Sequence, residues 1–124
     1  MRKVPLITAS LLMLCIPLLA CNGGGESPLK AKEATSRTLQ PADPELAGIY
    51  NRSCRSCHTV AATRSPLTGD TAAWAIRKQK GMDVLVNNVV RGIGGMPPYG
   101  LCMDCDADQF EALIEFMATG PATP

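Results

Sequence analysis

Two cysteine pairs and a single histidine are the residues whose types and spacing predict a specific chemistry in this chain. The two pairs read Cys54-Arg55-Ser56-Cys57-His58 and Cys102-Met103-Asp104-Cys105. A C-x-x-C-H sequence is the attachment signature of a c-type haem: the two thiols form thioethers to the haem periphery, and the next residue reaches the iron. We therefore predict one covalently bound haem c on Cys54 and Cys57, with His58 as an axial iron ligand.

The second axial ligand must be another residue type, because the chain contains no second histidine. Methionine, lysine, tyrosine and water remain as candidates. Met96 stands within a stretch rich in glycine and proline, 94–100. The glycines let the backbone approach a ring closely, and the prolines restrict the loop so that presenting the sulfur costs less entropy. We predict Met96 as the ligand, whereas Met117 falls in an apolar helical stripe and is predicted to belong to the core.

The composition is typical of a small domain built around a cofactor. Of the 124 residues, 46% are apolar but only 4% are aromatic, which is a thin supply of rings for a core. A flat apolar haem would supply the missing bulk. The net charge of +1 and the absence of a basic block give no support to nucleic-acid binding. The length excludes a multidomain enzyme.

The N-terminal residues predict export and a lipid anchor. Arg2 and Lys3 precede an uncharged apolar stretch, which is the layout of a secretory signal rather than of a membrane-spanning helix. Leu18-Leu19-Ala20-Cys21 resembles the lipobox of bacterial lipoproteins, where cleavage leaves a lipid-modified cysteine. Acyl chains on Cys21 would hold the protein on the periplasmic side of a bacterial membrane, and Cys15 would be removed with the signal. The alternative is an ordinary signal followed by a cysteine by chance.

A spacer is expected between this segment and the domain. Residues 22–42 show neither helical nor strand periodicity, and we expect a flexible linker with a reach of roughly 25 Å. The predicted divisions are a lipoprotein signal peptide at 1–20, a lipidated N-terminus and flexible linker at 21–42, a monohaem domain at 43–120 and a tail at 121–124.

Helical signals recur through the domain, each combining a capping aspartate with an apolar stripe. The candidate caps are Asp43, Asp70, Asp83 and Asp106. The helices that follow Asp70 and Asp83 would end at Gly81 and Gly92, and Asp106 with Gln109 resembles a capping box. Strand-like alternation is absent, so the domain is predicted to be all-α.

From about Asp43 to Gly120 the chain resembles a class I c-type cytochrome, and most of all the cytochrome c-five group. The residues that carry the resemblance are the C-x-x-C-H motif, Trp74, Met96-Pro97-Pro98 with Gly100, and the second cysteine pair. The resemblance implies a small fold of three to four helices wrapped around one covalently attached haem. The family's usual lysine after the Pro-Pro pair is Tyr99 here.

The resemblance also implies roles for individual side chains. The Pro66 carbonyl would accept a hydrogen bond from the His58 ring, and Trp74 would lie near a haem propionate, with Arg77 a weaker candidate for that place. Further implied contacts are a disulfide between Cys102 and Cys105 and packing of Tyr50 on the last helix near Phe110 and Ile114.

A haem with histidine and methionine on its two axial positions suits electron transfer rather than catalysis. We therefore predict a carrier, not an enzyme, that exchanges electrons with membrane-bound respiratory reductases or oxidases and takes no small-molecule substrate. Basic residues gather between 52 and 91 and acidic ones between 104 and 115, which could steer docking.

Other interpretations stay open at this point. The two C-x-x-C pairs could form a four-thiolate zinc or iron site, although 44 residues separate them and His58 and Met96 would have no role. Cys102 and Cys105 could be a dithiol oxidant, but a C-x-x-C motif with that role should open a helix within a βαβ unit, and no strand pattern is present. If Met96 left the iron, the haem could sense a gas or act on peroxide, but the chain has no further histidine for acid–base work.

Overall fold

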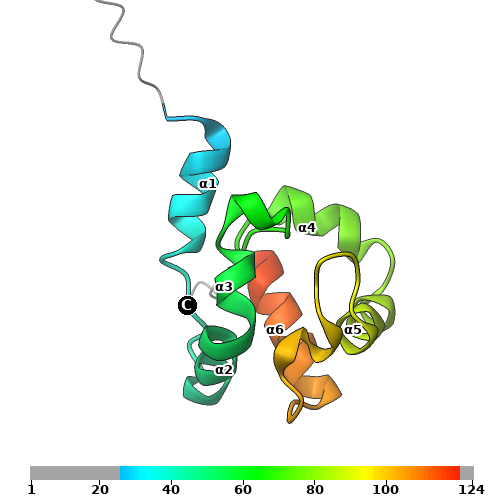
Figure 1. Cartoon of the computed structure of the whole chain (residues 1–124). Coiled ribbons are helices and arrows are strands. Elements are labelled where there is room, and N and C mark those ends of the chain that lie inside the picture. Colours follow the sequence, from blue (N-terminus) through cyan, green and yellow to red (C-terminus); the bar gives the residue numbers. More distant parts are fainter. Residues whose placement is uncertain (1–25, 121–124) are drawn as a thin grey trace, which may run out of the picture.

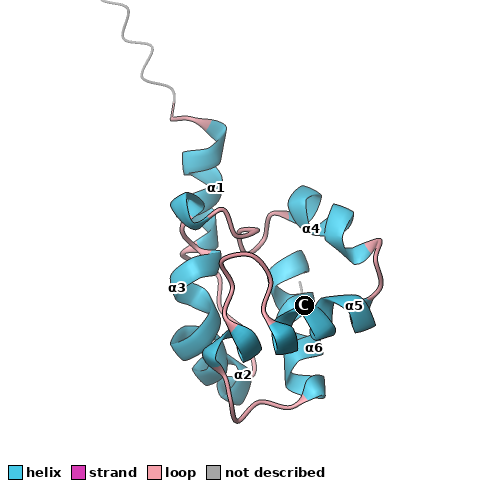
Figure 2. Cartoon of the chain, turned by 45° about the vertical axis from the view of Figure 1, so that its right-hand side comes forward, coloured by secondary structure: helices cyan, strands magenta, loops and turns pink. Residues whose placement is uncertain are grey.

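The computed structural model describes residues 26–120 (Figure 1). The predicted signal peptide, the predicted lipid site at Cys21 and the predicted tail at 121–124 lie outside these residues. The described elements are α1 (Pro28–Ser36), α2 (Pro44–Ile49), a π-helical turn η1 (Tyr50–Cys54), α3 (Arg55–His58), a 3₁₀ turn η2 (Ala61–Thr63), α4 (Thr71–Lys78), α5 (Met82–Arg91), a second 3₁₀ turn η3 (Pro98–Leu101) and α6 (Ala107–Thr119). Helices joined by loops make up the whole described part, without a strand (Figure 2), and the all-α prediction is confirmed.

Three of the four predicted helix caps are present. The Asp43 carboxylate accepts a hydrogen bond from the Leu46 N–H at 2.8 Å, and Asp70 caps α4 in the same way. Asp106 and Gln109 form a reciprocal capping box at the start of α6, with bonds of 2.8 and 3.1 Å. These bonds span three residues, which is why the sequence pattern alone identifies them.

The prediction that Asp83 caps a helix is wrong. Helix α5 begins at Met82, two residues before the start that an Asp83 cap would give, and its cap position is Gly81, which makes no side-chain capping bond. Gly81 has a φ of +92°, a conformation that residues with a Cβ avoid, so the chain turns into α5 at the glycine. Asp83 lies in the first turn instead, where its charge is favourable beside the positive end of the helix dipole.

The expectation of a flexible linker over 21–42 is also wrong for its second half. Residues 28–36 form helix α1, which Ser27 caps through a hydrogen bond to the Lys30 N–H. Leu39, after the helix, packs against the core, and Pro41 is buried. The side chains of α1 are mostly polar and dock through hydrogen bonds and ion pairs. Hydrophobic periodicity does not detect a helix of this kind.

The C-x-x-C-H motif lies at the end of a nearly continuous helix formed by α2, η1 and α3. The π-helical turn η1 carries Cys54, and α3 carries Cys57 and His58. A π-helical insertion rotates the residues that follow it relative to those before, and such insertions are frequent at functional sites. Here the turn begins at the core-facing Tyr50 and ends at Cys54, the first cysteine of the pair.

Helix α6 supplies much of the core. Phe110, Leu113, Ile114 and Met117 are all buried, which confirms the predicted stripe. Tyr50 is fully buried and meets α6 through an edge-on contact with Phe116, with ring centroids 5.1 Å apart. The implied packing of Tyr50 on α6 is therefore present, and its ring contact is with Phe116, two residues after Ile114 and six after Phe110.

No helix among residues 26–120 combines the length and the apolar character needed to span a membrane.

Candidate functional site

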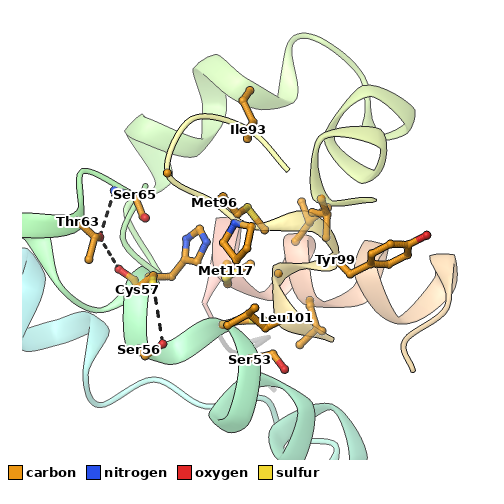
Figure 3. Close-up of a pocket in the computed structure, with 18 of the residues that line it drawn as sticks. Ser53, Ser56, Cys57, Thr63, Ser65, Ile93, Met96, Tyr99, Leu101 and Met117 are labelled. Atoms are coloured by element: carbon orange, nitrogen blue, oxygen red, sulfur yellow. Dashed lines mark hydrogen bonds between the residues drawn. The ribbon is translucent and has the colours of Figure 1, made fainter. Parts of the chain in front are cut away.

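A cavity of about 420 Å³ opens between α3, the loop after α5 and helix α6 (Figure 3). A second cavity of about 540 Å³ adjoins it on the side of α4 and α5. We call them the first and second lobes. Both lobes are lined by His58, Val89, Ile93, Met96, Ile114 and Met117, while Cys54 and Cys57 line only the first. The lining is mainly apolar and brings two thiols, an imidazole and two thioethers to one hollow.

The two thiols lie on one wall of the first lobe, and neither is in a disulfide. Cys57 is exposed at the mouth, and Cys54 is partly covered. Burial raises the pKa of the Cys54 thiol to about 11, which keeps it protonated at neutral pH. A protonated thiol of this kind is a poor nucleophile.

His58 is buried, and a backbone carbonyl orients its ring. Its Nδ1 lies 2.8 Å from the Pro66 carbonyl oxygen, the contact that the resemblance implied. Because a carbonyl oxygen only accepts, Nδ1 carries the proton and Nε2 keeps a free lone pair for a metal. Burial, and then the nearby Arg77 charge, lower the pKa of His58, while the bond to Pro66 opposes the shift. The buried ring is therefore pre-oriented and uncharged.

Trp74 packs beside the histidine. Its ring stacks on His58, with centroids 5.9 Å apart and planes 26° from parallel. Its indole N–H donates to the Leu67 carbonyl oxygen at 2.9 Å and is not free for a carboxylate. Trp74 lines the second lobe and supports the histidine. The cationic side chains that line this lobe are Arg77 and Lys80.

Met96 lies in a tight turn that requires a glycine at its start. The Met96 N–H and carbonyl both bond to Ile93, which closes the turn. Gly92 has a φ of +77°, and a Cβ there would come within 2.7 Å of the Met96 carbonyl oxygen. At Gly100, a Cβ would lie 3.2 Å from the Met96 Cε. Figure 3 shows Met96 on this loop and Cys57 on α3 lining the same cavity.

Met117 also borders both lobes, although the stripe of α6 predicts it to be core. It is 4% exposed and fixed within α6. The structure therefore brings a second methionine sulfur to the cavity, from a residue that sequence periodicity alone assigned to packing. Met96 is distinguished by its place on a glycine-rich loop rather than on a packed helix.

The second cysteine pair is separate from the first. Cys102 and Cys105 form a disulfide with Cα atoms 5.4 Å apart, next to the strained turn of η3. Among residues 26–120, the cluster close enough to hold a metal ion is Cys102, Asp104 and Cys105, and neither Cys54 nor Cys57 joins it. This arrangement does not assemble the four-thiolate site considered from the sequence.

Arg52 ties the two cysteine segments together, a role that sequence reasoning missed. Its guanidinium binds both Asp104 oxygens, at 2.9 and 2.8 Å, and lies 3.3 Å from the Cys102 sulfur. The same pairing holds the pKa of Asp104 below its usual range. No local pattern could have identified a pair separated by 52 residues.

Several charges in the predicted basic and acidic regions are paired within the domain. Besides Arg52 with Asp104, Lys78 bonds to Glu115 at 2.7 Å. These exposed pairs contribute little to stability. Their charges are nevertheless paired within the domain, although the sequence suggested that they could steer docking. Arg64, Arg77 and Lys80 remain along the lobes.

Comparisons with known proteins agree with this geometry. Residues 41–117 match the family described as "Cytochrome C oxidase, cbb3-type, subunit III". The chain is 38% identical over 72 residues to "Cytochrome c5" of Ectopseudomonas mendocina, covering 56% of this chain and 83% of that protein. It is 37% identical over 72 residues to "Cytochrome c5" of Azotobacter vinelandii, covering 56% of this chain and 87% of that protein.

A solved structure is similar as well. A chain of the "Crystal structure of electron transfer complex of nitrite reductase with cytochrome c" aligns with a TM-score of 0.54 and 33% sequence identity, covering 61% of this chain and 93% of that chain. This chain belongs to the class I c-type cytochromes of the c5 group, which are electron carriers with one covalently bound haem c. The predictions of family, fold class and cofactor are confirmed.

Proposed function

We propose that this cytochrome is a membrane-tethered, extracytoplasmic electron carrier in which His58 and Met96 are the axial ligands of the haem iron. The observation that supports the ligand pair is that both side chains border both lobes, with the His58 lone pair left free by Pro66. Cys54 and Cys57 attach the haem at the wall of the first lobe. When bound, the haem supplies one-electron redox chemistry at iron, and a methionine ligand raises its reduction potential.

The residues around the lobes have distinct tasks in this proposal. The hydrogen bond to the Pro66 carbonyl and the stacking of Trp74 hold the His58 ring in one orientation. Buried apolar side chains, among them Ile114 and Met117, exclude water from the hollow. We further propose that Arg77 and Lys80, rather than Trp74, receive the haem propionates, because they are the cations of the second lobe.

A visible absorption spectrum tests the ligand pair. The protein is measured oxidised and reduced, after denaturation and acid-acetone extraction of free haem. We expect a sharp reduced α band that stays with the polypeptide and, in the native oxidised protein, the weak long-wavelength iron–methionine band. Retained haem without that band would contradict the methionine ligand and favour a haem-based sensor. A colourless protein with stoichiometric zinc would contradict the haem site itself.

The redox partners are proposed to be proteins, in line with the similar structure of an electron transfer complex. The first lobe opens beside two exposed apolar side chains, Ile93 and Leu101. Exposed apolar side chains suit the centre of a transient contact with another protein, with polar groups such as Arg64 around them. We propose that membrane-bound respiratory reductases or oxidases dock at this mouth.

Membrane tethering is proposed from the lipobox-like residues that end at Cys21. Because Ser27 already caps α1, only the five residues 22–26 separate Cys21 from the first helix, instead of about twenty. Five residues span at most roughly 20 Å between the flanking Cα atoms. The domain would therefore stay close to the bilayer surface, which suits partners in the same membrane.

Replacing Cys21 with alanine is expected to move the protein from the membrane fraction to the soluble fraction, because the lipid attachment site is lost. The measurement is an immunoblot of separated fractions, with haem staining to show that the domain is mature. Cys15→Ala, within the predicted signal, is the matched control and should leave the distribution unchanged. Continued membrane association of the Cys21 variant would indicate an uncleaved anchor instead.

A further inference from the structure

Helix α1 lies outside the region that matches the cytochrome family, which begins at residue 41. It nevertheless docks on the segment that follows the haem-attachment motif. Figures 1 and 2 both place α1 beside the turn after α3. An added helix at this position adjoins the loop that orients His58.

The first contact is made by Glu33, in the middle of α1. Its Oε2 atom accepts a hydrogen bond from the Ala61 backbone N–H at 2.9 Å. Its Oε1 atom accepts one from the Arg37 guanidinium at 2.6 Å. These two bonds hold the pKa of Glu33 below its usual range, with the Ala61 bond the larger cause. The ionised carboxylate thus caps η2 three residues after His58.

Two more contacts lie on either side of the first. The guanidinium of Arg55, inside the C-x-x-C-H motif, donates to the Arg37 carbonyl oxygen at the end of α1. The Lys32 ammonium lies 3.0 Å from each Asp70 oxygen. Asp70 caps α4, which carries Trp74. Helix α1 therefore contacts the chain at three points: Arg55 before His58, Ala61 just after it, and Asp70 at the end of the loop that follows.

The loop between these contacts depends on support from outside. Between His58 and Asp70 its regular structure is the single 3₁₀ turn η2, which is followed by Arg64 at a φ of +60°. Its Pro66 carbonyl sets the direction of the imidazole. Displacement of the loop would rotate or release the ring.

We propose that α1 is a clamp on the histidine side of the haem, and that Glu33 is a positioning residue that keeps the Pro66 carbonyl aligned with His58. This inference rests on the proposed role of His58 as an iron ligand. It assigns to the N-terminal extension a function in tuning the haem, besides its place between the domain and the proposed tether.

The test uses the haem-loaded protein and three variants. Glu33→Ala removes the acceptor for Ala61, Glu33→Gln retains an acceptor oxygen, and Lys30→Gln changes an exposed side chain of the same helix whose nearest acid, Glu26, is 3.9 Å away. Amide hydrogen exchange reports the clamp at Ala61 and at Thr68, whose N–H bonds to the His58 carbonyl. Proton NMR of the oxidised protein reports the orientation of the His58 ring through the hyperfine-shifted haem-methyl signals.

We expect Glu33→Ala to accelerate exchange at Ala61 about tenfold and to change the spread of the haem-methyl signals. Glu33→Gln should keep most of the slow exchange at Ala61 and most of the native spread of haem-methyl signals. Lys30→Gln should match the unmodified protein in both measurements. Unchanged exchange in Glu33→Ala would overturn the clamp. Faster exchange with unchanged haem-methyl signals would overturn the positioning role, because α1 would then only stabilise the loop. Absence of hyperfine-shifted His58 signals in the unmodified protein would instead contradict the proposed iron ligand.

Discussion

Met96→Leu is expected to leave the haem covalently attached while lowering the reduction potential by on the order of 0.1 V, a modest part of the range of roughly 0.8 V that axial ligands set. Leucine has a similar volume, so the loop closed by the Ile93 contacts should persist without a sulfur to offer. The open axial position should then bind cyanide when oxidised and carbon monoxide when reduced. Redox titration and ligand-binding spectra measure these changes.

Two other methionines make the result specific. Met103 is 72% exposed and lines neither lobe, so Met103→Leu should behave like the unmodified protein. Met117 lines both lobes from within α6, so Met117→Leu should cost some stability but keep the iron–methionine band. If the band disappears with Met117→Leu and survives Met96→Leu, the ligand is Met117 and our assignment is wrong.

Replacing Cys54 and Cys57 together with serine is expected to abolish covalent haem and most of the native fold. Without the haem, the mainly apolar lining of the first lobe would face water instead of the ring. A small domain has a free energy of unfolding of only about 5–15 kcal/mol, so the loss of this burial is expected to be decisive. The aromatic-poor core cannot replace the haem. Far-UV circular dichroism and haem staining after denaturing electrophoresis measure the loss.

The matched control carries the same two substitutions at Cys102 and Cys105. That disulfide closes a very short loop, which limits its effect on the entropy of the unfolded chain. The control should therefore retain covalent haem and unfold cooperatively at a somewhat lower temperature. Stable folding or haem staining of the Cys54 and Cys57 double variant would show that the domain does not depend on covalent attachment.

Local features of this protein could be predicted from the sequence because their determinants lie within a few residues. The haem-attachment motif spans five residues, and the caps at Asp43 and Asp106 act over three. The apolar stripe of α6 follows from the period of the helix. These features were sufficient to predict an all-α haem protein and its family, which the comparisons confirmed.

Contacts between distant segments were decided only by the tertiary structure. The Trp74 N–H donates to the Leu67 carbonyl oxygen, and Arg52 pairs with Asp104 across 52 residues. Helix α1 shows no clear apolar stripe and is held by contacts such as Glu33 with Ala61. Which polar groups satisfy one another depends on which surfaces meet in space, and neither periodicity nor local spacing carries that information.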